Sequence, residues 1–196
     1  MTRTLPHDDQ HGFATRSVHA GQVVEPLSGA VMTPIYQTST YVQEGLGRHR
    51  GYEYARTQNP TREALERNVA SLEGGTHGFA FGSGLAALDT VLKLLRSGDH
   101  VVCSRSVFGS TIKLFQDFAR FGVQTSFVSQ TEVDAWRAAV QPNTRLLFAE
   151  SPTNPLTEVC DIRALAAIAR DAGASLAVDN CFCTPALQRP VEYGAD

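Results

Sequence analysis

The sequence lacks the features that mark membrane proteins and nucleic-acid-binding proteins. Its apolar runs are much shorter than the roughly 20 residues that a helix needs to cross a bilayer. The net charge is only -3, with acids and bases interspersed, so no basic face predicts binding to nucleic acid. The polar start Met1–Gly12 has no apolar core and does not predict a signal peptide. We therefore expect neither a membrane protein nor a nucleic-acid-binding protein.

Cysteine and lysine are both scarce. The chain has four cysteines, at Cys103, Cys160, Cys181 and Cys183. Their spacing is not that of zinc or redox sites, and three of them lie on or beside apolar runs typical of strands. We expect reduced interior thiols of a cytoplasmic protein, and no metal site. The only lysines are Lys93 and Lys113, which both fall in stretches that we expect to be helical and exposed to solvent.

The chain does have enough apolar residues for a core, which are 42% of its 196 residues. Residues 1–57 show no sustained hydrophobic period and contain Pro26, Gly29 and Pro34, which indicates an extended arm. Residues 58–196 are predicted to form one domain. This division gives an arm followed by a domain rather than two packed domains.

Within the second part, apolar runs typical of strands alternate with stretches of helical period. The predicted strands are Gly78–Phe81, His100–Ser104, Val123–Val128, Arg145–Glu150 and Ser175–Asp179. The predicted helices are Pro60–Leu72, Leu85–Leu95, Thr111–Phe121, Val133–Val140 and Asp161–Asp171. This alternation predicts an α/β fold with a mostly parallel sheet covered by helices on both faces. In such a sheet ligands bind at the carboxyl ends of the strands.

The segment Gly51–Arg62 places a phenol and a guanidinium two residues apart, at Tyr54 and Arg56. In an extended segment both side chains point to one face. Asn59 and Pro60 then predict the start of a helix, with a capping side chain before a proline. A phenol and a forked cation beside a helix start suit a phosphate group. The alternative is a surface turn with an unrelated arginine.

The turn Phe81-Gly-Ser-Gly-Leu85 predicts an anion site, because free N–H groups at a helix start face the carboxyl edge of the sheet. The string from Gly82 to Ala87 also fits a dinucleotide fingerprint. The next strand ends in Ser104-Arg105 and not in an acid, which disfavours NAD but leaves NADP open. A third interpretation is that the glycines only make a tight turn.

Taken together, these segments resemble a known family. The motifs are Gly51–Arg62, the turn at Phe81, the string Glu150-Ser-Pro-Thr-Asn-Pro155 and the apolar strand ending in Asp179. In this order and spacing they resemble the pyridoxal-phosphate enzymes of cysteine and methionine metabolism, from about Phe13 to Asp196. That family includes cystathionine synthases and lyases and homoserine-ester sulfhydrylases. The resemblance implies the large domain of a fold-type I transferase preceded by an arm, with pyridoxal 5'-phosphate as cofactor.

The resemblance implies a role for each candidate residue. Ser83, Gly84 and Leu85 would hold the cofactor phosphate, and Tyr54 and Arg56 would complete that cup from a neighbouring subunit of a homotetramer. Asp179 would pair with the protonated pyridine nitrogen, and the alternative is that it caps the next turn. Phe108 would stack on the cofactor ring, and the alternative is core packing. Asn154 would bind the phenolic oxygen and orient the substrate carboxylate, and the alternative is a simple proline-stiffened loop.

The resemblance also implies a lysine that forms a Schiff base with the cofactor, about 25 residues after the strand-end aspartate. Counted from Asp179, this position falls beyond Asp196. No catalytic residue is therefore expected within the chain, which we interpret as an N-terminal part of a larger enzyme.

The stretches Ser104–Thr111 and Val178–Gln188 resemble O-succinylhomoserine sulfhydrylases, whereas Gly51–Arg62 and Leu72–Phe81 look more like cystathionine gamma-synthases and gamma-lyases. Many relatives have tyrosine where Phe108 stands, and phenylalanine cannot donate a proton. We therefore expect gamma-replacement on an O-acylhomoserine, with sulfide giving homocysteine. The alternatives are a cystathionine gamma-synthase or gamma-lyase, an NADP-dependent oxidoreductase, or a binding module without catalysis.

Overall fold

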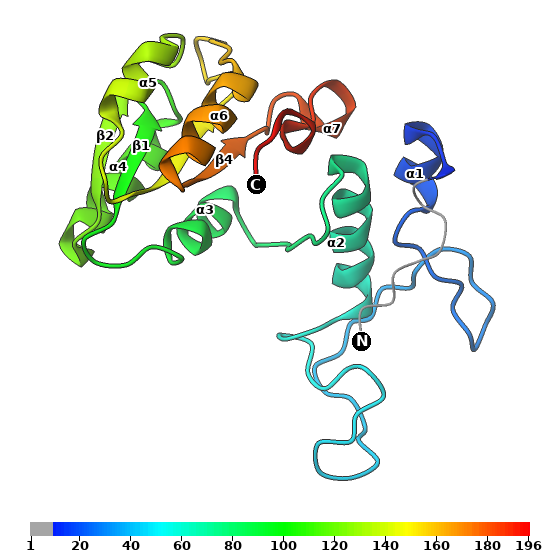
Figure 1. The fold of residues 1–196 in the computed structure, drawn as a ribbon. Helices are drawn as coiled ribbons and strands as arrows, with labels where there is room; N and C mark the ends of the chain where they lie inside the picture. Colours follow the sequence, from blue (N-terminus) through cyan, green and yellow to red (C-terminus); the bar gives the residue numbers. More distant parts are fainter. Residues whose placement is uncertain (1–9) are drawn as a thin grey trace. The chain divides into compact units, whose positions relative to one another are not determined.

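The structure is a computed structural model that describes residues 10–196, so most of the polar start Met1–Gly12 lies outside the described residues. The chain divides into two compact units, one that ends at Ala80 and one that comprises Phe81–Asp196 (Figure 1). The division into an arm to residue 57 and a domain from residue 58 stays a prediction.

Two helices pack together in the first unit, α1 (Phe13–His19) and α2 (Pro60–Glu73). The α2 helix begins as predicted, because the Asn59 side chain accepts hydrogen bonds from the first-turn amides, 2.9 Å from Thr61 N. It ends at Gly74, whose left-handed φ of 75° suits a residue without a Cβ. The α1 helix was not predicted. It is short and none of its residues is buried, so it leaves no hydrophobic period in the sequence.

The stretch between α1 and α2 has no regular strand among its described residues. Two isolated bridges occur in it, Thr40 with Tyr54 and Gln43 with His49. Several of its large apolar side chains are exposed, with Leu27, Ile35, Val42 and Leu46 each more than four-fifths accessible. These exposed side chains do not form a hydrophobic core within the described part of this stretch.

A four-stranded parallel sheet forms the centre of the second unit. Its strands are β1 (His100–Ser104), β2 (Gln124–Val128), β3 (Thr144–Glu150) and β4 (Ser175–Asp179). Their order is β2-β1-β3-β4, and every neighbouring pair is parallel. The predicted fold class and four of the five predicted strands are thereby confirmed.

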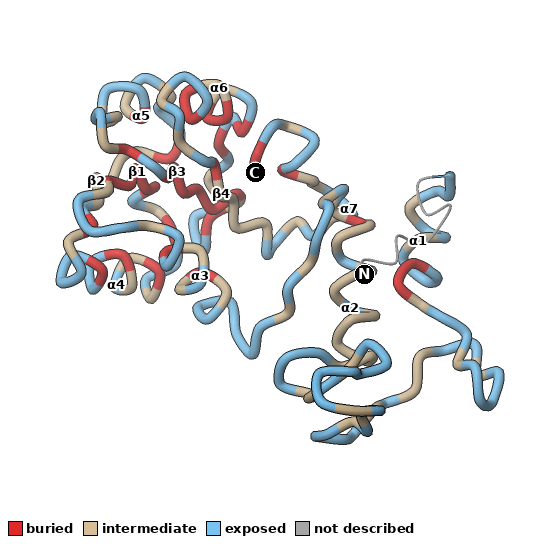
Figure 2. The backbone as a smooth tube through the Cα atoms, turned by 60° about the horizontal axis from the view of Figure 1, so that its bottom comes forward, coloured by how far each residue is buried: buried red, intermediate tan, exposed pale blue. Residues whose placement is uncertain are grey.

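Helices cover both faces of this sheet. On one face α3 (Gly84–Leu92) and α4 (Gly109–Asp117) pack on alternate residues of the strands, and the short helix η2 (Phe118–Phe121) continues α4. On the other face lie α5 (Val133–Ala139) and α6 (Ile162–Ala172). The short elements α7 (Thr184–Leu187) and η3 (Pro190–Tyr193) follow β4. Figure 2 shows the buried residues concentrated in the strands and on the inner sides of these helices.

The alternation of side chains along the strands gives each face its own core. Leu146 and Phe148 of β3 pack in the cluster that contains Leu88 and Leu92 of α3. Leu147 and Ala149 pack with α6 in the other cluster. Because successive residues of a strand point to opposite faces, Glu150 lies on the α3–α4 side, as do Leu146 and Phe148.

One predicted strand is absent, since residues 78–81 are irregular. A strand needs a partner for its backbone groups. Here the Ala80 N–H donates to the Glu66 side chain of α2, with 3.0 Å between nitrogen and oxygen, and Gly78 lies directly against the Glu66 carbonyl. The segment therefore packs on a helix instead of joining the sheet.

The cysteine prediction is correct in part. All four thiols are free, and Cys103 and Cys160 are buried. Cys181 is exposed and Cys183 is half-buried, so these two are not interior residues. They differ because they follow β4 in the turn before α7 and are not part of a strand. Within residues 10–196, no helix combines the length and the apolar character that a membrane span requires.

Candidate functional site

The carboxyl edge of the sheet brings three of the predicted site residues together. Phe108 stands where the loop after β1 enters α4, Asn154 lies in the turn after β3, and Asp179 ends β4. Since β1, β3 and β4 are neighbours in the sheet, these three positions share one edge. The side chains of Phe108 and Asn154 are exposed there, and that of Asp179 is half-buried.

The Glu150 carboxylate at the end of β3 links the loops that carry Phe108 and Asn154. Its Oε2 accepts a hydrogen bond from the Phe108 N–H at 2.7 Å, and its Oε1 accepts one from the Asn154 N–H at 3.0 Å. The strand pairing sets Glu150 beside Asp179. One side chain thus contacts the backbone at two of the predicted site residues and is the strand neighbour of the third.

The backbone of Glu150 is also held on both sides. Its carbonyl accepts a hydrogen bond from the buried Gln130 side chain, with 2.6 Å between Nε2 and O. The following residue, Ser151, donates its N–H to the Asp179 carbonyl at 3.1 Å. The end of β3 is therefore fixed between the segment after β2 and the end of β4.

Burial dominates the electrostatics of Glu150. Glu150 is only 6% exposed, and this desolvation raises the pKa of its carboxyl group above the ordinary value. The two backbone N–H groups of Phe108 and Asn154 oppose this shift, and the nearby Asp179 adds to it. Two acidic side chains therefore stand side by side at this edge, and the geometry favours a cation or several donors beside them.

The α3 helix presents backbone donors toward the same edge. A short turn leads from α3 into the amino end of β1, so the first turn of α3 points toward the carboxyl ends of the strands. Ser83 caps the helix, and its Oγ accepts the Ala86 N–H at 3.2 Å. The N–H groups of Gly84 and Leu85 have no acceptor within the helix. Ser83, Gly84 and Leu85 are all exposed.

The glycine at position 84 is not required by the packing of the described chain. A Cβ built on Gly84 would meet no atom within 4 Å, and the residue does not have a left-handed φ. The same is true of Gly82. A glycine without a conformational or packing cause at a helix start is suited to the close approach of a bound group.

Tyr54 and Arg56 lie together in the first unit. The Arg56 guanidinium sits over the Tyr54 ring, 4.9 Å from its centroid. Arg62 of α2 fixes this turn, because its guanidinium donates to the carbonyls of Ala55, Arg56 and Thr57. The predicted pair therefore exists, although a turn and not an extended segment brings the side chains together.

Sequence reasoning missed Glu150 and Arg62. The signal for Glu150 was present, since it is a carboxylate at the end of an apolar strand, the same pattern that singled out Asp179. Arg62 had no such signal, because its hydrogen bonds go to backbone carbonyls that any sequence would supply. Both residues hold segments that carry predicted site residues.

The two lysines lie away from the strand ends. Lys93 caps the C-terminus of α3, where it forms an ion pair with Asp89. Lys113 lies within α4, and both side chains are exposed as predicted. Neither residue lies in a loop at the carboxyl end of a strand.

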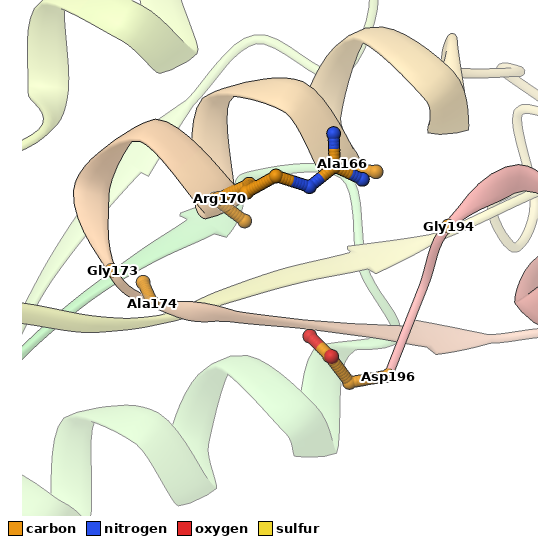
Figure 3. A pocket seen from close by; sticks show the side chains of 7 residues that line it. Ala166, Arg170, Gly173, Ala174, Gly194 and Asp196 are labelled. Carbon is orange, nitrogen blue, oxygen red and sulfur yellow. The ribbon is translucent and has the colours of Figure 1, made fainter.

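A hollow of about 270 Å³ lies elsewhere, beside the C-terminal end of α6. Arg170 and Asp196 are among its lining residues (Figure 3). Ala174, which also lines it, directly precedes β4. The hollow is therefore at the amino end of that strand, opposite to the edge that carries the predicted residues.

Comparison with known proteins gives consistent matches. A family model described as Cys/Met metabolism PLP-dependent enzyme matches residues 14–196. A probable cystathionine gamma-synthase of Herpetosiphon aurantiacus is 49% identical over 187 residues, 95% of this chain and 59% of that protein. A cystathionine beta-lyase of Coxiella burnetii is 50% identical over 195 residues, 98% of this chain and 50% of that protein. The crystal structure of metB from Corynebacterium glutamicum matches with a TM-score of 0.93 at 40% identity, covering 96% of this chain and 50% of that one. The chain spans about half the length of the relatives it matches.

Proposed function

Because the chain belongs to the family of Cys/Met metabolism PLP-dependent enzymes, we propose that the carboxyl edge of its sheet binds pyridoxal 5'-phosphate. The observation that carries this proposal is the cluster of Phe108, Asn154 and Asp179, which share this edge around Glu150. The family is PLP-dependent.

The residues present fit the chemical groups of this cofactor. The unpaired first-turn amides of α3 and the Ser83 hydroxyl suit a phosphate dianion. The exposed ring of Phe108 offers an apolar surface for an aromatic ring. The Asp179 carboxylate beside Glu150 gives the negative charge that a protonated pyridine nitrogen needs. A dinucleotide is not supported, because its fingerprint requires a strand before Gly82 and residues 78–81 form none.

Each residue would have one task. Bound pyridoxal phosphate supplies a ring that accepts electrons from carbon atoms of an amino acid. Asp179 would hold a proton on the ring nitrogen, and the amides of Gly84 and Leu85 would anchor the phosphate. Asn154 would bind the phenolic oxygen of the cofactor and orient the substrate carboxylate. We place the lysine of the family beyond Asp196, since the two lysines of this chain are exposed on helices.

For the whole protein we propose gamma-replacement on an O-acylhomoserine. The bond between Cγ and the acyl oxygen breaks, the acid leaves as a carboxylate, and sulfide forms a C–S bond that gives homocysteine. A carboxylate is a good leaving group and needs little acid assistance. This agrees with a phenylalanine at position 108, which has no proton to donate. A cystathionine gamma-synthase is the second candidate, favoured by the name of the Herpetosiphon relative.

We further propose that the protein is a homotetramer whose active sites are shared between subunits. The support comes from the first unit, where exposed apolar side chains such as Leu46 and Val42 lack a core of their own. Tyr54 and the exposed Arg56 would meet the phosphate of a neighbouring subunit. The four free cysteines agree with a reducing, cytoplasmic compartment.

The test is a product assay on the complete protein. The protein is given O-succinylhomoserine with sulfide in one reaction and O-succinylhomoserine with cysteine in a second. A third reaction contains cystathionine alone. We expect homocysteine and succinate to form fastest in the first reaction. Faster formation of cystathionine from cysteine would assign the protein as the synthase, and rapid breakdown of cystathionine would assign it as a lyase.

A further inference from the structure

The Glu150 side chain is the only group among the described residues that the structure shows bonded to both the Phe108 and the Asn154 amides. These amides belong to different loops, 46 positions apart in the sequence (154 minus 108). The loops have their own internal hydrogen bonds, such as Thr111 N–H to the Phe108 carbonyl at 2.8 Å. The carboxylate is what joins one loop to the other.

A carboxylate is an unusual group at this position. It is almost completely buried, it stands next to the acidic Asp179, and within residues 10–196 no ion pair to it is formed. Desolvation and the like charge both act against it. Its compensation within the described residues consists of the two backbone N–H groups.

From this geometry we infer that Glu150 is a positioning residue that sets the spacing between Phe108 and Asn154 by accepting one backbone hydrogen bond on each carboxylate oxygen. The inference rests on the proposed function, in which Phe108 and Asn154 contact the cofactor. Glu150 itself touches neither cofactor nor substrate in this account. It acts through the two loops that it holds.

The chemistry of the carboxylate explains why other side chains cannot replace it. A glutamine of equal size has one acceptor oxygen, and its NH2 group would face a backbone N–H that also donates. An aspartate is one methylene shorter and cannot reach both amides from the same strand position. An alanine leaves both amides without an acceptor. Glu150→Gln should therefore release one loop, and Glu150→Ala should release both. Glu150→Asp should strain the link between the loops.

The experiment measures hydrogen exchange of single amides in the cofactor-free complete protein. In the wild type, the Phe108 and Asn154 amides should be protected. In Glu150→Ala both should exchange roughly tenfold faster or more, the factor for a lost hydrogen bond to a charged group. In Glu150→Gln only one of the two amides should exchange faster. Glu158→Gln is the matched control, since its side chain lies in the same turn but its buried Oε2 accepts no hydrogen bond from any of residues 10–196.

A second readout is the affinity for pyridoxal phosphate, measured from its visible absorption. We expect Glu150→Gln and Glu150→Ala to bind it at least roughly tenfold more weakly than the wild type and the Glu158→Gln control, in line with the loss of one such hydrogen bond.

The outcomes separate the two proposals. Unprotected Phe108 and Asn154 amides in the wild type, or unchanged exchange in Glu150→Ala, would overturn the positioning role even where the cofactor binds normally. The wild-type measurement decides this even if a variant fails to fold. A wild type that binds no pyridoxal phosphate would overturn the proposed function, while faster exchange in the variants would still support the link between the loops.

Discussion

Replacing Asp179 separates its structural role from its proposed electrostatic role. Within residues 10–196 its side chain accepts one hydrogen bond, from the Cys181 N–H to Oδ1 at 3.0 Å. Asp179→Asn keeps an acceptor oxygen at this place and removes the charge. Asp179→Ala removes both. Both variants therefore lose the negative charge, but only Asp179→Ala also loses the hydrogen bond.

The expected change in stability is small. One hydrogen bond of a half-buried group contributes about 1 kcal/mol to the free energy of unfolding, which is the loss that we expect for Asp179→Ala. The adjacent Glu150 offsets part of this loss, because removing Asp179 removes a like charge beside it. Asp179→Asn should be close to the wild type in stability.

The expected change in activity is large for both variants. Removing one preorganised electrostatic contact from an active site lowers the rate roughly 100- to 1,000-fold. Asp179 would keep the ring nitrogen protonated, and the ring depends on that proton to accept electrons. Both Asp179→Asn and Asp179→Ala should therefore lower kcat by at least about two orders of magnitude. Urea unfolding and initial rates of homocysteine formation measure the two quantities on the same preparations.

Asp171→Asn is the matched control, since Asp171 is exposed on α6, which covers the opposite face of the sheet. It should leave both quantities unchanged. Near-normal turnover of Asp179→Asn would refute the proposed role of this carboxylate. A stability loss of several kcal/mol in Asp179→Asn would show that its main role is structural.

Three further predictions concern other parts of the chain. Leu165→Ala, at a fully buried position of α6, should lower the free energy of unfolding by about 2–5 kcal/mol in urea titrations. Burial lowers the pKa of His100 in the folded state. As the pH drops below about 6.5, the unfolded state therefore takes up a proton that the folded state does not, and the free energy of unfolding should fall. A His100→Gln variant should lose that part of the pH dependence. Arg56→Ala subunits mixed with subunits that lack the family lysine should recover part of the activity, because mixed dimers contain one intact site; no recovery after verified subunit exchange would contradict a shared site.

Sequence-based prediction was accurate for elements whose boundaries are set by residues close in the sequence. The strands His100–Ser104 and Ser175–Asp179 were correct at both ends, because buried parallel strands appear as short apolar runs between turns. The helix at Pro60 was correct at its start, because Asn59 and Pro60 act on their own first turn. These features depend on neighbouring residues only.

Two of the errors concern features that depend on distant partners. Residues 78–81 have the composition of a strand, but the Ala80 N–H bonds to Glu66 of α2. The role of Glu150 depends on two amides from other loops, and neither amide is marked by its side chain. The positions of Phe108, Asn154 and Asp179 at one edge could be predicted, because parallel strands place their carboxyl ends together.

The crystal structure of the complete protein with pyridoxal phosphate tests the central claim most directly. We predict the phosphate on the N–H groups of Gly84 and Leu85, the ring against Phe108, and the ring nitrogen within hydrogen-bond distance of Asp179. A cofactor bound away from the carboxyl edge of the sheet, or with its ring nitrogen directed away from Asp179, would contradict the account.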